Sequence, residues 1–249
     1  MSRTIRIATR KSELALWQAN HVSDLLRETH PGLEVELLPM VTKGDIILDQ
    51  PLAQIGGKGL FLKELERAML KGEADIAVHS MKDVPVEQVP GLEVEVLLKR
   101  ANPFDALLSR EGQTLDELPA SARVGTSSLR RQCQLKALRP DIEVRDLRGN
   151  VNTRVRKLQE GEYDAIILAC AGLERLKMDN LITEALAPPR WLPAGTQGTS
   201  GIQNRSGDDE VRALIAPLMD AEAVTRTRAE RGVATLLHGS CQLPLAVFA

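Results

Sequence analysis

The side chains best suited to chemistry lie together in residues 74–86. An apolar run over 75–78 is typical of a buried strand, and His79, Lys82 and Asp83 follow it before a proline. Open α/β sheets bind ligands at the carboxyl ends of their strands, where these polar side chains would lie. The alternative interpretation is an ordinary strand exit whose charges are solvated.

Arginines recur directly after predicted strands in the second half of the chain. Residues 126–131, Thr-Ser-Ser-Leu-Arg-Arg, place hydroxyls at a helix start and two guanidinium groups in its first turn. Cations at that end oppose the helix dipole, and a bound anion would reconcile them. Arg148 precedes a second helix, which carries Arg154 and Arg156, and Arg175 follows a third strand. Such a set suits a polycarboxylate, whereas the alternative is solvated surface or ion pairs.

Cys241 lies in the small-residue loop Gly-Ser-Cys-Gln, where it is a candidate nucleophile or attachment point. The alternative is a buried inert thiol, which is our interpretation of Cys133 and Cys170. The chain has 3 cysteines, and no pair has metal-ligand spacing. We therefore expect a reducing compartment, no disulfide framework and no bound metal. For His79, which has no nucleophile partner in its motif, we expect a structural hydrogen bond.

The composition is that of an ordinary globular protein. The chain of 249 residues is 43% hydrophobic and 27% charged, which suggests about two domains. A formal net charge of -2 argues against a surface that binds nucleic acid, and an aromatic content of 2% argues against base-stacking platforms. We find no apolar signal segment and no apolar run of membrane-span length, so we expect a cytoplasmic protein.

The elements that must position these residues alternate between strands and helices. Residues 5–8, 33–41 and 75–78 predict strands, with a helix capped by Ser12 and another over 61–70 between them. This order implies right-handed crossovers and a parallel sheet.

A second unit follows in the same style, and the two units predict a cleft that encloses a small anion and closes about a hinge. A strand over 92–98 is expected at the exit from the first unit. The second unit is predicted to contain strands at 105–108, 123–126, 142–147 and 164–169. Its predicted helices are 127–138, capped by Ser127, 151–159 and 171–176. Beyond a linker at 187–193 we expect helices over 208–218 and 221–237 and an unpartnered strand at 245–248.

A set of segments resembles one family across essentially the whole chain, in the family's order. These segments are 7–12, 16–18, 56–61, 79–85, 124–131, 147–150, 164–169 and 239–242. The family is hydroxymethylbilane synthase, also called porphobilinogen deaminase. The resemblance implies two periplasmic-binding-protein-like α/β lobes with a hinge and a cleft, formed by 1–98 with 195–217 and by 99–194, plus a truncated third α/β domain over 218–249.

The resemblance further implies a monomeric cytoplasmic transferase of haem biosynthesis that acts on small molecules and binds neither nucleic acid nor membranes. It would condense four porphobilinogens head to tail, releasing ammonia, and would use a dipyrromethane cofactor joined by a thioether to Cys241. Asp83 matches the catalytic aspartate, placed to stabilise positive charge on pyrrole nitrogens and to help move protons. The matching cofactor-binding residues are Cys241, Lys82, Ser127, Arg130, Arg131 and Arg148, and the matching substrate-binding residues are Arg10, Ser12, Lys58, Ser128, Arg154 and Arg175.

The chain departs from the family's pattern at several places. It ends soon after Cys241, so we expect the third domain to be shortened. Thr196 stands where the family has glycine, which predicts strain if φ is positive there. Gln203 replaces a glutamate, and Gln54 replaces a basic residue. The alternatives are therefore a catalytically impaired member that binds cofactor or pyrroles, a bilobal organic-anion binding protein and, more distantly, a nucleic-acid binder.

Overall fold

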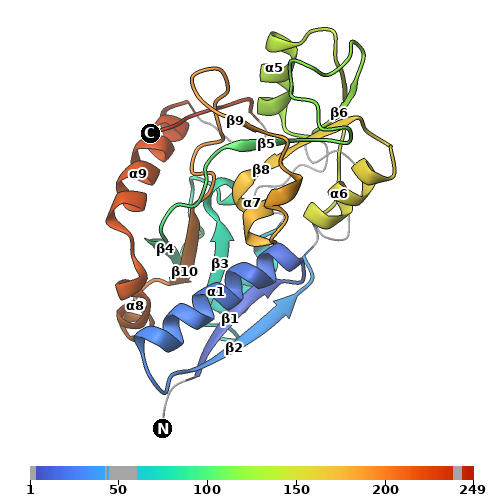
Figure 1. Ribbon diagram of the computed structural model, residues 1–249. Coiled ribbons are helices and arrows are strands. Elements are labelled where there is room, and N and C mark those ends of the chain that lie inside the picture. Colours follow the sequence, from blue (N-terminus) through green and yellow to red (C-terminus); the bar gives the residue numbers. More distant parts are fainter. Residues whose placement is uncertain (1–3, 43, 45–60, 238–242) are drawn as a thin grey trace. The chain divides into compact units, whose positions relative to one another are not determined.

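The computed structural model describes residues 4–42, 44, 61–237 and 243–249 (Figure 1). The chain forms two compact units, each with one five-stranded sheet. The first unit comprises Met1–Ile47, Gly57–Arg100 and Thr199–Ala229, and the second comprises Leu48–Gly56, Ala101–Gly198 and Glu230–Ala249. The finer domain boundaries implied by the resemblance, including a separate domain over 218–249, stay a prediction.

The sheet of the first unit has the strand order β2-β1-β3-β10-β4. Strands β1 (Thr4–Arg10), β2 (Glu34–Met40) and β3 (Ile76–Ser80) are parallel, as predicted. Strand β10 (Ser200–Arg205) is antiparallel to both β3 and the edge strand β4 (Leu92–Leu97). The sequence did not predict β10, which brings a distant part of the chain beside β3.

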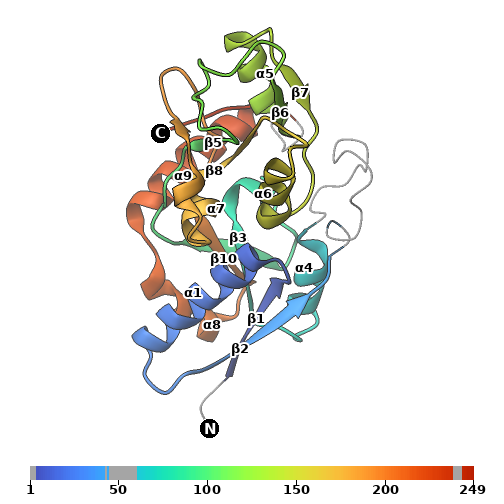
Figure 2. The same cartoon turned by 45° about the vertical axis from the view of Figure 1, so that its right-hand side comes forward.

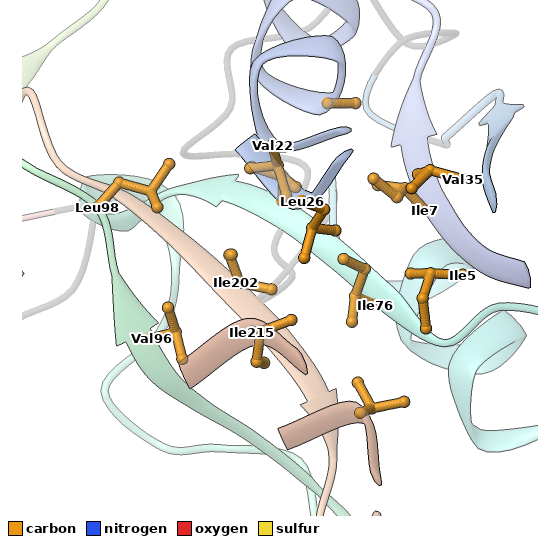
Figure 3. Close-up of a cluster of buried hydrophobic side chains, with 13 residues drawn as sticks. Ile5, Ile7, Val22, Leu26, Val35, Ile76, Val96, Leu98, Ile202 and Ile215 are labelled. Carbon is orange, nitrogen blue, oxygen red and sulfur yellow. The ribbon is translucent and has the colours of Figure 1, made fainter. Parts of the chain in front are cut away.

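Helices cover both faces of this sheet, so β3 carries apolar side chains on both sides, with Ile76 and Val78 on one face and Ala77 on the other. On one face, Val22 and Leu26 of α1 (Glu13–Thr29) pack against Ile7 of β1 and Ile76 of β3 (Figure 3). Each such buried side chain contributes roughly 1.5–3 kcal/mol to folding. The apolar face of α4 (Lys63–Leu70) contacts the opposite face of the sheet. The other helices of this unit are α8 (Asp209–Ile215), the 3-10 helix η3 (Ala216–Leu218) and the first part of α9 (Ala221–Leu236).

The second unit repeats this arrangement with the strand order β7-β6-β8-β5-β9. Strands β6 (Arg123–Gly125), β7 (Glu143–Arg145) and β8 (Ala165–Ala169) are parallel, whereas β5 (Asp105–Ser109) is antiparallel to β8 and to β9 (Glu184–Leu186). The helices of this unit are α5 (Leu129–Leu138), α6 (Val151–Gln159) and α7 (Cys170–Arg175), followed by the 3-10 helix η2 (Asp179–Leu181); Figure 2 shows α6 and α7 beside β8.

The predicted cap of α5 is wrong by one residue. The helix begins at Leu129 with Ser128 at the N-cap position, and the Ser128 side chain makes no capping hydrogen bond. The Ser127 hydroxyl instead accepts from the backbone N–H of Leu147 and donates to its carbonyl oxygen, both at 3.0 Å. This side chain joins the loop before α5 to the loop before α6, so it is not available to cap a helix.

The predicted strand at 245–248 is also wrong, because these residues are irregular. The backbone N–H of Val247 donates to the carbonyl oxygen of Pro193 at 3.3 Å. The N–H of Ala249 donates to the carboxylate of Glu230, on α9, at 2.9 Å. The segment therefore pairs with a carbonyl and a carboxylate of its own unit rather than with a sheet edge.

Thr196 adopts a positive φ of 62°, the condition under which we expected strain. The side chain is 3% exposed, and the backbone N–H donates to the carboxylate of buried Glu230. A β-branched residue rarely adopts this left-handed conformation, so the surrounding contacts must hold it there.

We expect Thr196→Gly to be more stable than Thr196→Ala by about 1 kcal/mol, because glycine adopts positive φ without the steric cost that alanine pays. Comparing these two variants removes the effect of the lost threonine side chain. Thr199 is the matched control, since it is equally buried and its φ is not positive. There glycine should be less stable than alanine. Urea unfolding of the four variants measures both differences, and the same order at both positions would contradict the argument.

Candidate functional site

Asp83 lies in the 3-10 helix η1 (Met81–Asp83), directly after β3. Met81 and Val84 are buried, while Lys82 is half-buried and Asp83 is exposed. The backbone N–H of Met81 donates to the carbonyl oxygen of Thr199 at 3.0 Å. The two apolar side chains thus anchor the turn and present the Asp83 carboxylate to solvent from a fixed backbone.

A buried amide holds the end of β3 to its neighbours. The Nε2 group of Gln18, on α1, donates to the hydroxyls of Ser80 and Ser200, each at 3.1 Å. Ser80 ends β3 and Ser200 begins β10, so this amide ties three elements together where the turn begins. The position of Asp83 therefore depends on β10 as well as on its own strand.

His79 makes the structural hydrogen bond expected of it. Its Nε2 lies 2.9 Å from Oε1 of Gln203, and Nε2 of Gln203 donates to Oε1 of Glu66 at 3.4 Å. All three side chains are buried. Burial lowers the pKa of His79 to about 4 and raises the pKa of Glu66. The histidine is therefore neutral at physiological pH.

Acid is expected to destabilise the chain through His79. The unfolded histidine binds a proton near pH 6.5, whereas the folded one does so only near pH 4. Between these values the unfolded state holds more protons, so stability falls as pH falls, by about 3 kcal/mol in total. His79→Asn should lack this contribution in urea unfolding between pH 7 and pH 4. Glu66 acts in the opposite sense, because its raised pKa costs stability as pH rises, and Glu66→Gln separates the two. An unchanged pH dependence in His79→Asn would contradict the assignment.

Two further candidates lie in the first unit, at the end of β1 and the start of α1. The guanidinium of Arg10 lies 4.2 Å from the centroid of the Phe61 ring, a cation–π contact. Ser12 is the N-cap of α1, as predicted, and its hydroxyl accepts from the N–H of Ala15 at 3.4 Å. The structure thus gives Ser12 a capping role, and its predicted contact with substrate stays a prediction. Three positions singled out in the sequence, Lys58, Gln54 and Cys241, lie outside the described residues.

In the second unit, Arg130 and Arg131 are both buried, and both form ion pairs with the carboxylate of Asp105. Nη1 of Arg130 donates to Oδ2 of Asp105 at 2.7 Å and to the carbonyl oxygen of Leu192 at 2.7 Å. Arg131 donates to Oδ1 of Asp105 from Nε at 3.1 Å and from Nη2 at 2.6 Å. Its Nη1 donates to the carbonyl oxygen of Ile167 at 2.9 Å. The ion-pair alternative considered for these arginines therefore applies to both.

Asp105 accepts two more hydrogen bonds, from distant parts of the chain. The indole Nε1 of Trp191 donates to Oδ2 at 2.7 Å, and Nε2 of Gln197 donates to Oδ1 at 3.0 Å. Burial opposes ionisation of Asp105, yet the two guanidinium groups hold the pKa of its carboxyl well below the usual range. Asp105 was not among the residues predicted to be functional, although a carboxylate that opens a buried apolar strand indicates a buried cation.

The Asp105 cluster suits a ligand that carries a carboxylate. Two guanidinium groups and one carboxylate leave one positive charge uncompensated within the cluster. Nε and Nη2 of Arg130 have no hydrogen-bond partner among residues 4–42, 44, 61–237 and 243–249. Because this side chain is only 5% exposed, a donor edge and a charge are available in a poorly solvated place. The acidic side chains of a dipyrromethane fit such a donor set.

The other candidates of the second unit gather at the ends of its parallel strands. Strands β6 and β7 are parallel neighbours, so the loops that carry Ser128 and Arg148 both begin at the carboxyl ends of the strands. Nε of Arg154 donates to the carbonyl oxygen of Gly149 at 2.8 Å, and Nη2 of Arg175 donates to that of Gly198 at 2.9 Å. Burial lowers the pKa of Arg175. The residues predicted to bind a polycarboxylate thus follow the carboxyl ends of parallel strands, and their contacts with a ligand stay a prediction.

The part of the chain that the structure describes contains neither a metal-binding cluster nor a membrane-spanning helix. No group of histidine, cysteine, aspartate and glutamate side chains there could hold a metal ion. No helix there has both the length and the apolar character needed to cross a bilayer.

The fold is shared with solved structures of low sequence identity. The methionine binding protein MetQ matches with a TM-score of 0.57 and 12% identity, over 92% of this chain and 95% of that one. The VFT2 domain of Bordetella pertussis BvgS matches with a TM-score of 0.50 and 14% identity, over 92% of each chain. These similarities confirm the predicted fold class and show the fold alone.

The sequence comparisons are more specific. Residues 5–213 match the family model described as porphobilinogen deaminase, dipyromethane cofactor binding domain. The chain is 58% identical over 246 residues to a porphobilinogen deaminase of Stenotrophomonas maltophilia, which covers 99% of this chain and 81% of that protein. The matched range contains both the Asp83 turn and the Asp105 cluster. This family model and the close relative together show that the chain belongs to the porphobilinogen deaminase family.

Proposed function

We propose that this chain is a hydroxymethylbilane synthase that condenses four porphobilinogen molecules head to tail with release of ammonia, and that Asp83 is its catalytic carboxylate. The observation that carries the proposal is the identity of 58% with a porphobilinogen deaminase over nearly the whole chain. The geometry of the Asp83 turn supports the residue's role, since an exposed carboxylate is held there by buried Met81 and Val84.

The Asp83 carboxylate would act on charge and protons during each condensation. Positive charge develops on pyrrole nitrogens as the carbon–carbon bond forms, and a fixed carboxylate stabilises it. The same group takes up or returns a proton, an effect worth about 10²- to 10⁴-fold in rate. Lys82, next to it in η1, and Arg10 are proposed to bind acidic side chains of the ligands, and Lys58 is proposed to act in the same way.

The cofactor carboxylates are proposed to lie on the second unit. Arg130 offers its Nε and Nη2 edge, and the charge left over in the Asp105 cluster favours an anion there. Arg148, Ser127 and Arg131 complete the proposed cofactor set, and Ser128, Arg154 and Arg175 the proposed substrate set. A dipyrromethane attached at Cys241 supplies the pyrrole position to which substrate units are added.

We further propose that the protein acts as a cytoplasmic monomer. The sparse, odd number of cysteines supports a reducing compartment. The expectation of a buried thiol is wrong for Cys133, which is exposed on α5, and is confirmed for Cys170, which is buried. An exposed free thiol at Cys133 is consistent with a reducing compartment. Light scattering of the purified chain tests the monomer, and a stable dimer would contradict it.

The intact mass of the purified chain under denaturing conditions tests the function and its anchor. We expect the wild-type mass to exceed the sequence value by one dipyrromethane. Cys241→Ser should lose this adduct, because position 241 then offers no thiol for the thioether. Cys133→Ser removes an exposed free thiol elsewhere and should keep the adduct. An adduct that survives in Cys241→Ser would move the anchor elsewhere. A bare wild-type mass would favour the impaired or the anion-binding alternative.

A further inference from the structure

The turn that carries Asp83 has little internal stability. The 3-10 helix η1 consists of three residues, and the backbone N–H of Val84 closes it by donating to the carbonyl oxygen of Met81 at 3.2 Å. Ser80 is its N-cap residue, and the Ser80 side chain makes no capping hydrogen bond. A single helical turn is not stable by itself, because it fixes several dihedral angles for very few hydrogen bonds. Contacts from outside η1 must therefore fix the backbone of Asp83.

The side chain of Gln18 supplies one of these contacts, from the face of the sheet that α1 covers. Its Nε2 donates to the Ser80 hydroxyl at 3.1 Å, so the hydroxyl that could cap η1 binds to α1 instead. Gln18 is 5% exposed, and Val22 and Leu26 of the same helix pack against the sheet. The first end of the turn is therefore joined to a firmly packed helix.

The opposite face of the sheet holds the next residue of the turn, Met81. Gly201 follows Ser200 on β10, so a side chain at position 201 would point away from α1. A Cβ there would overlap Sδ of Met81 and lie 2.9 Å from Cγ1 of Val94, so the glycine leaves the space that Met81 fills. The backbone N–H of Met81 also donates to the carbonyl oxygen of Thr199 at 3.0 Å. The turn is thus held from both faces, and Gln18 acts from the α1 face.

We propose that Gln18 is a positioning residue of the reaction, which fixes the Asp83 carboxylate through its hydrogen bond to Ser80. The inference rests on the catalytic role proposed for Asp83. Ser80 lies three residues before Asp83, so a displacement of Ser80 moves the carboxylate with it. A misplacement of about 1 Å in a catalytic group costs up to about 10²-fold in rate. Gln18 and Ser80 both lie in segments that resemble the family, 16–18 and 79–85.

The chain offers a matched control for this contact in Ser200. The same Nε2 of Gln18 donates to the Ser200 hydroxyl, also at 3.1 Å. Ser200 lies directly opposite Ser80 in the β10–β3 register and is 3% exposed, but it is not part of the turn. Ser200→Ala therefore removes a hydrogen bond of the same length from the same amide, and it should cost at least as much stability as Ser80→Ala. A difference in turnover between these two variants reports on the turn.

Steady-state kinetics give the first test. Ser80→Ala and Gln18→Met should each lower kcat by about 10- to 10²-fold and leave KM within about twofold. Ser80→Thr, which keeps the hydroxyl, should restore most of kcat, and Ser200→Ala should keep it. The double variant of Gln18→Met and Ser80→Ala should be no slower than Gln18→Met alone, because both changes remove one contact.

Three kinetic results would overturn the inference. An equal loss of kcat in Ser80→Ala and Ser200→Ala would show that only stability matters. An unchanged kcat in Ser80→Ala with an unchanged KM would show that the contact is dispensable. A raised KM with an unchanged kcat would make Ser80 a substrate contact rather than part of a positioning pair.

Amide hydrogen exchange gives a second test that needs no turnover. The N–H of Met81 should exchange about tenfold faster in Ser80→Ala than in Ser200→Ala, because the turn opens locally when its first end is released. The N–H of Leu98, which donates to the carbonyl oxygen of Ser200 at 2.9 Å, should exchange equally in both variants. Equal rates at Met81 would overturn the inference, even if Gln18→Met failed to fold.

Failure of this inference differs from failure of the role proposed for Asp83. Full turnover in Asp83→Asn would remove that catalytic role and leave the exchange rates of Met81 unchanged. A large loss of turnover in Asp83→Asn, together with equal kcat and equal exchange in Ser80→Ala and Ser200→Ala, would keep the catalytic role and overturn the positioning role of Gln18.

Discussion

Replacing Asp83 by asparagine is expected to lower turnover by about 10²- to 10⁴-fold, the range typical of lost acid–base catalysis. Asparagine has nearly the same shape but cannot carry the negative charge that stabilises a cationic pyrrole, nor can it exchange a proton. The side chain is exposed, and the turn is held by Met81, Val84 and the carbonyl of Thr199. We therefore expect stability within about 0.5 kcal/mol of the wild type.

The measurement is the steady-state rate of hydroxymethylbilane formation, read together with the intact mass. Asp83→Asn should keep the cofactor adduct, since attachment is proposed at Cys241. Glu87→Gln is the matched control, because it removes an exposed carboxylate from the same loop. That variant should turn over normally. Near-normal turnover in Asp83→Asn would refute its catalytic role, and a lost adduct would show that the residue acts earlier, in cofactor attachment.

Asp105→Asn should destabilise the second unit by about 3–5 kcal/mol, the cost of leaving buried charges without their partner. The carboxylate oxygens accept from Arg130, Arg131, Trp191 and Gln197, all within 3.1 Å. An asparagine offers one acceptor oxygen and turns its NH₂ group toward other donors. Two buried guanidinium groups would then lack a counter-charge.

Urea unfolding measures this loss, and the chain offers a close control. Asp164 pairs with Arg123 through three hydrogen bonds of 2.7–3.0 Å, but the two side chains are 27% and 30% exposed. Asp164→Asn should therefore cost about 1 kcal/mol or less. If Asp105→Asn does not fold, Trp191→Phe removes a single donor to Oδ2 and should give a smaller, measurable loss. Equal costs at Asp105 and Asp164 would contradict the argument from burial.

The local features of this fold could be predicted because they depend on neighbouring residues. The cap at Ser12, the helix Val151–Gln159 and the three parallel strands of each unit follow from apolar periodicity and turn chemistry over short spans. Short motifs were equally informative for function, because each segment that resembles porphobilinogen deaminases is an uninterrupted stretch of the sequence. Asp83 was found in this way, as the polar exit of an apolar strand.

Strand β10 was not predicted, because its sequence, Ser-Gly-Ile-Gln-Asn-Arg, has no apolar alternation. Its polar side chains are buried by partners that are distant in the chain: Gln203 meets His79 and Glu66, and Asn204 meets Glu93. Hydrogen bonds satisfy these groups where hydrophobic contact normally would. A pattern based on hydrophobicity does not detect such a strand.

The family, the α/β class and the candidate residues could be predicted because they depend on residue type and short-range order. Which of the candidates are paired internally depends instead on tertiary contacts. Arg130 and Arg131 look alike in sequence, yet each meets Asp105 differently, and the carboxylate also gathers Trp191 from 86 residues away. Ser127 and Leu147, 20 residues apart, meet in the same way. A buried charge or hydroxyl is satisfied by whatever the fold brings beside it, and sequence separation carries little information about that partner.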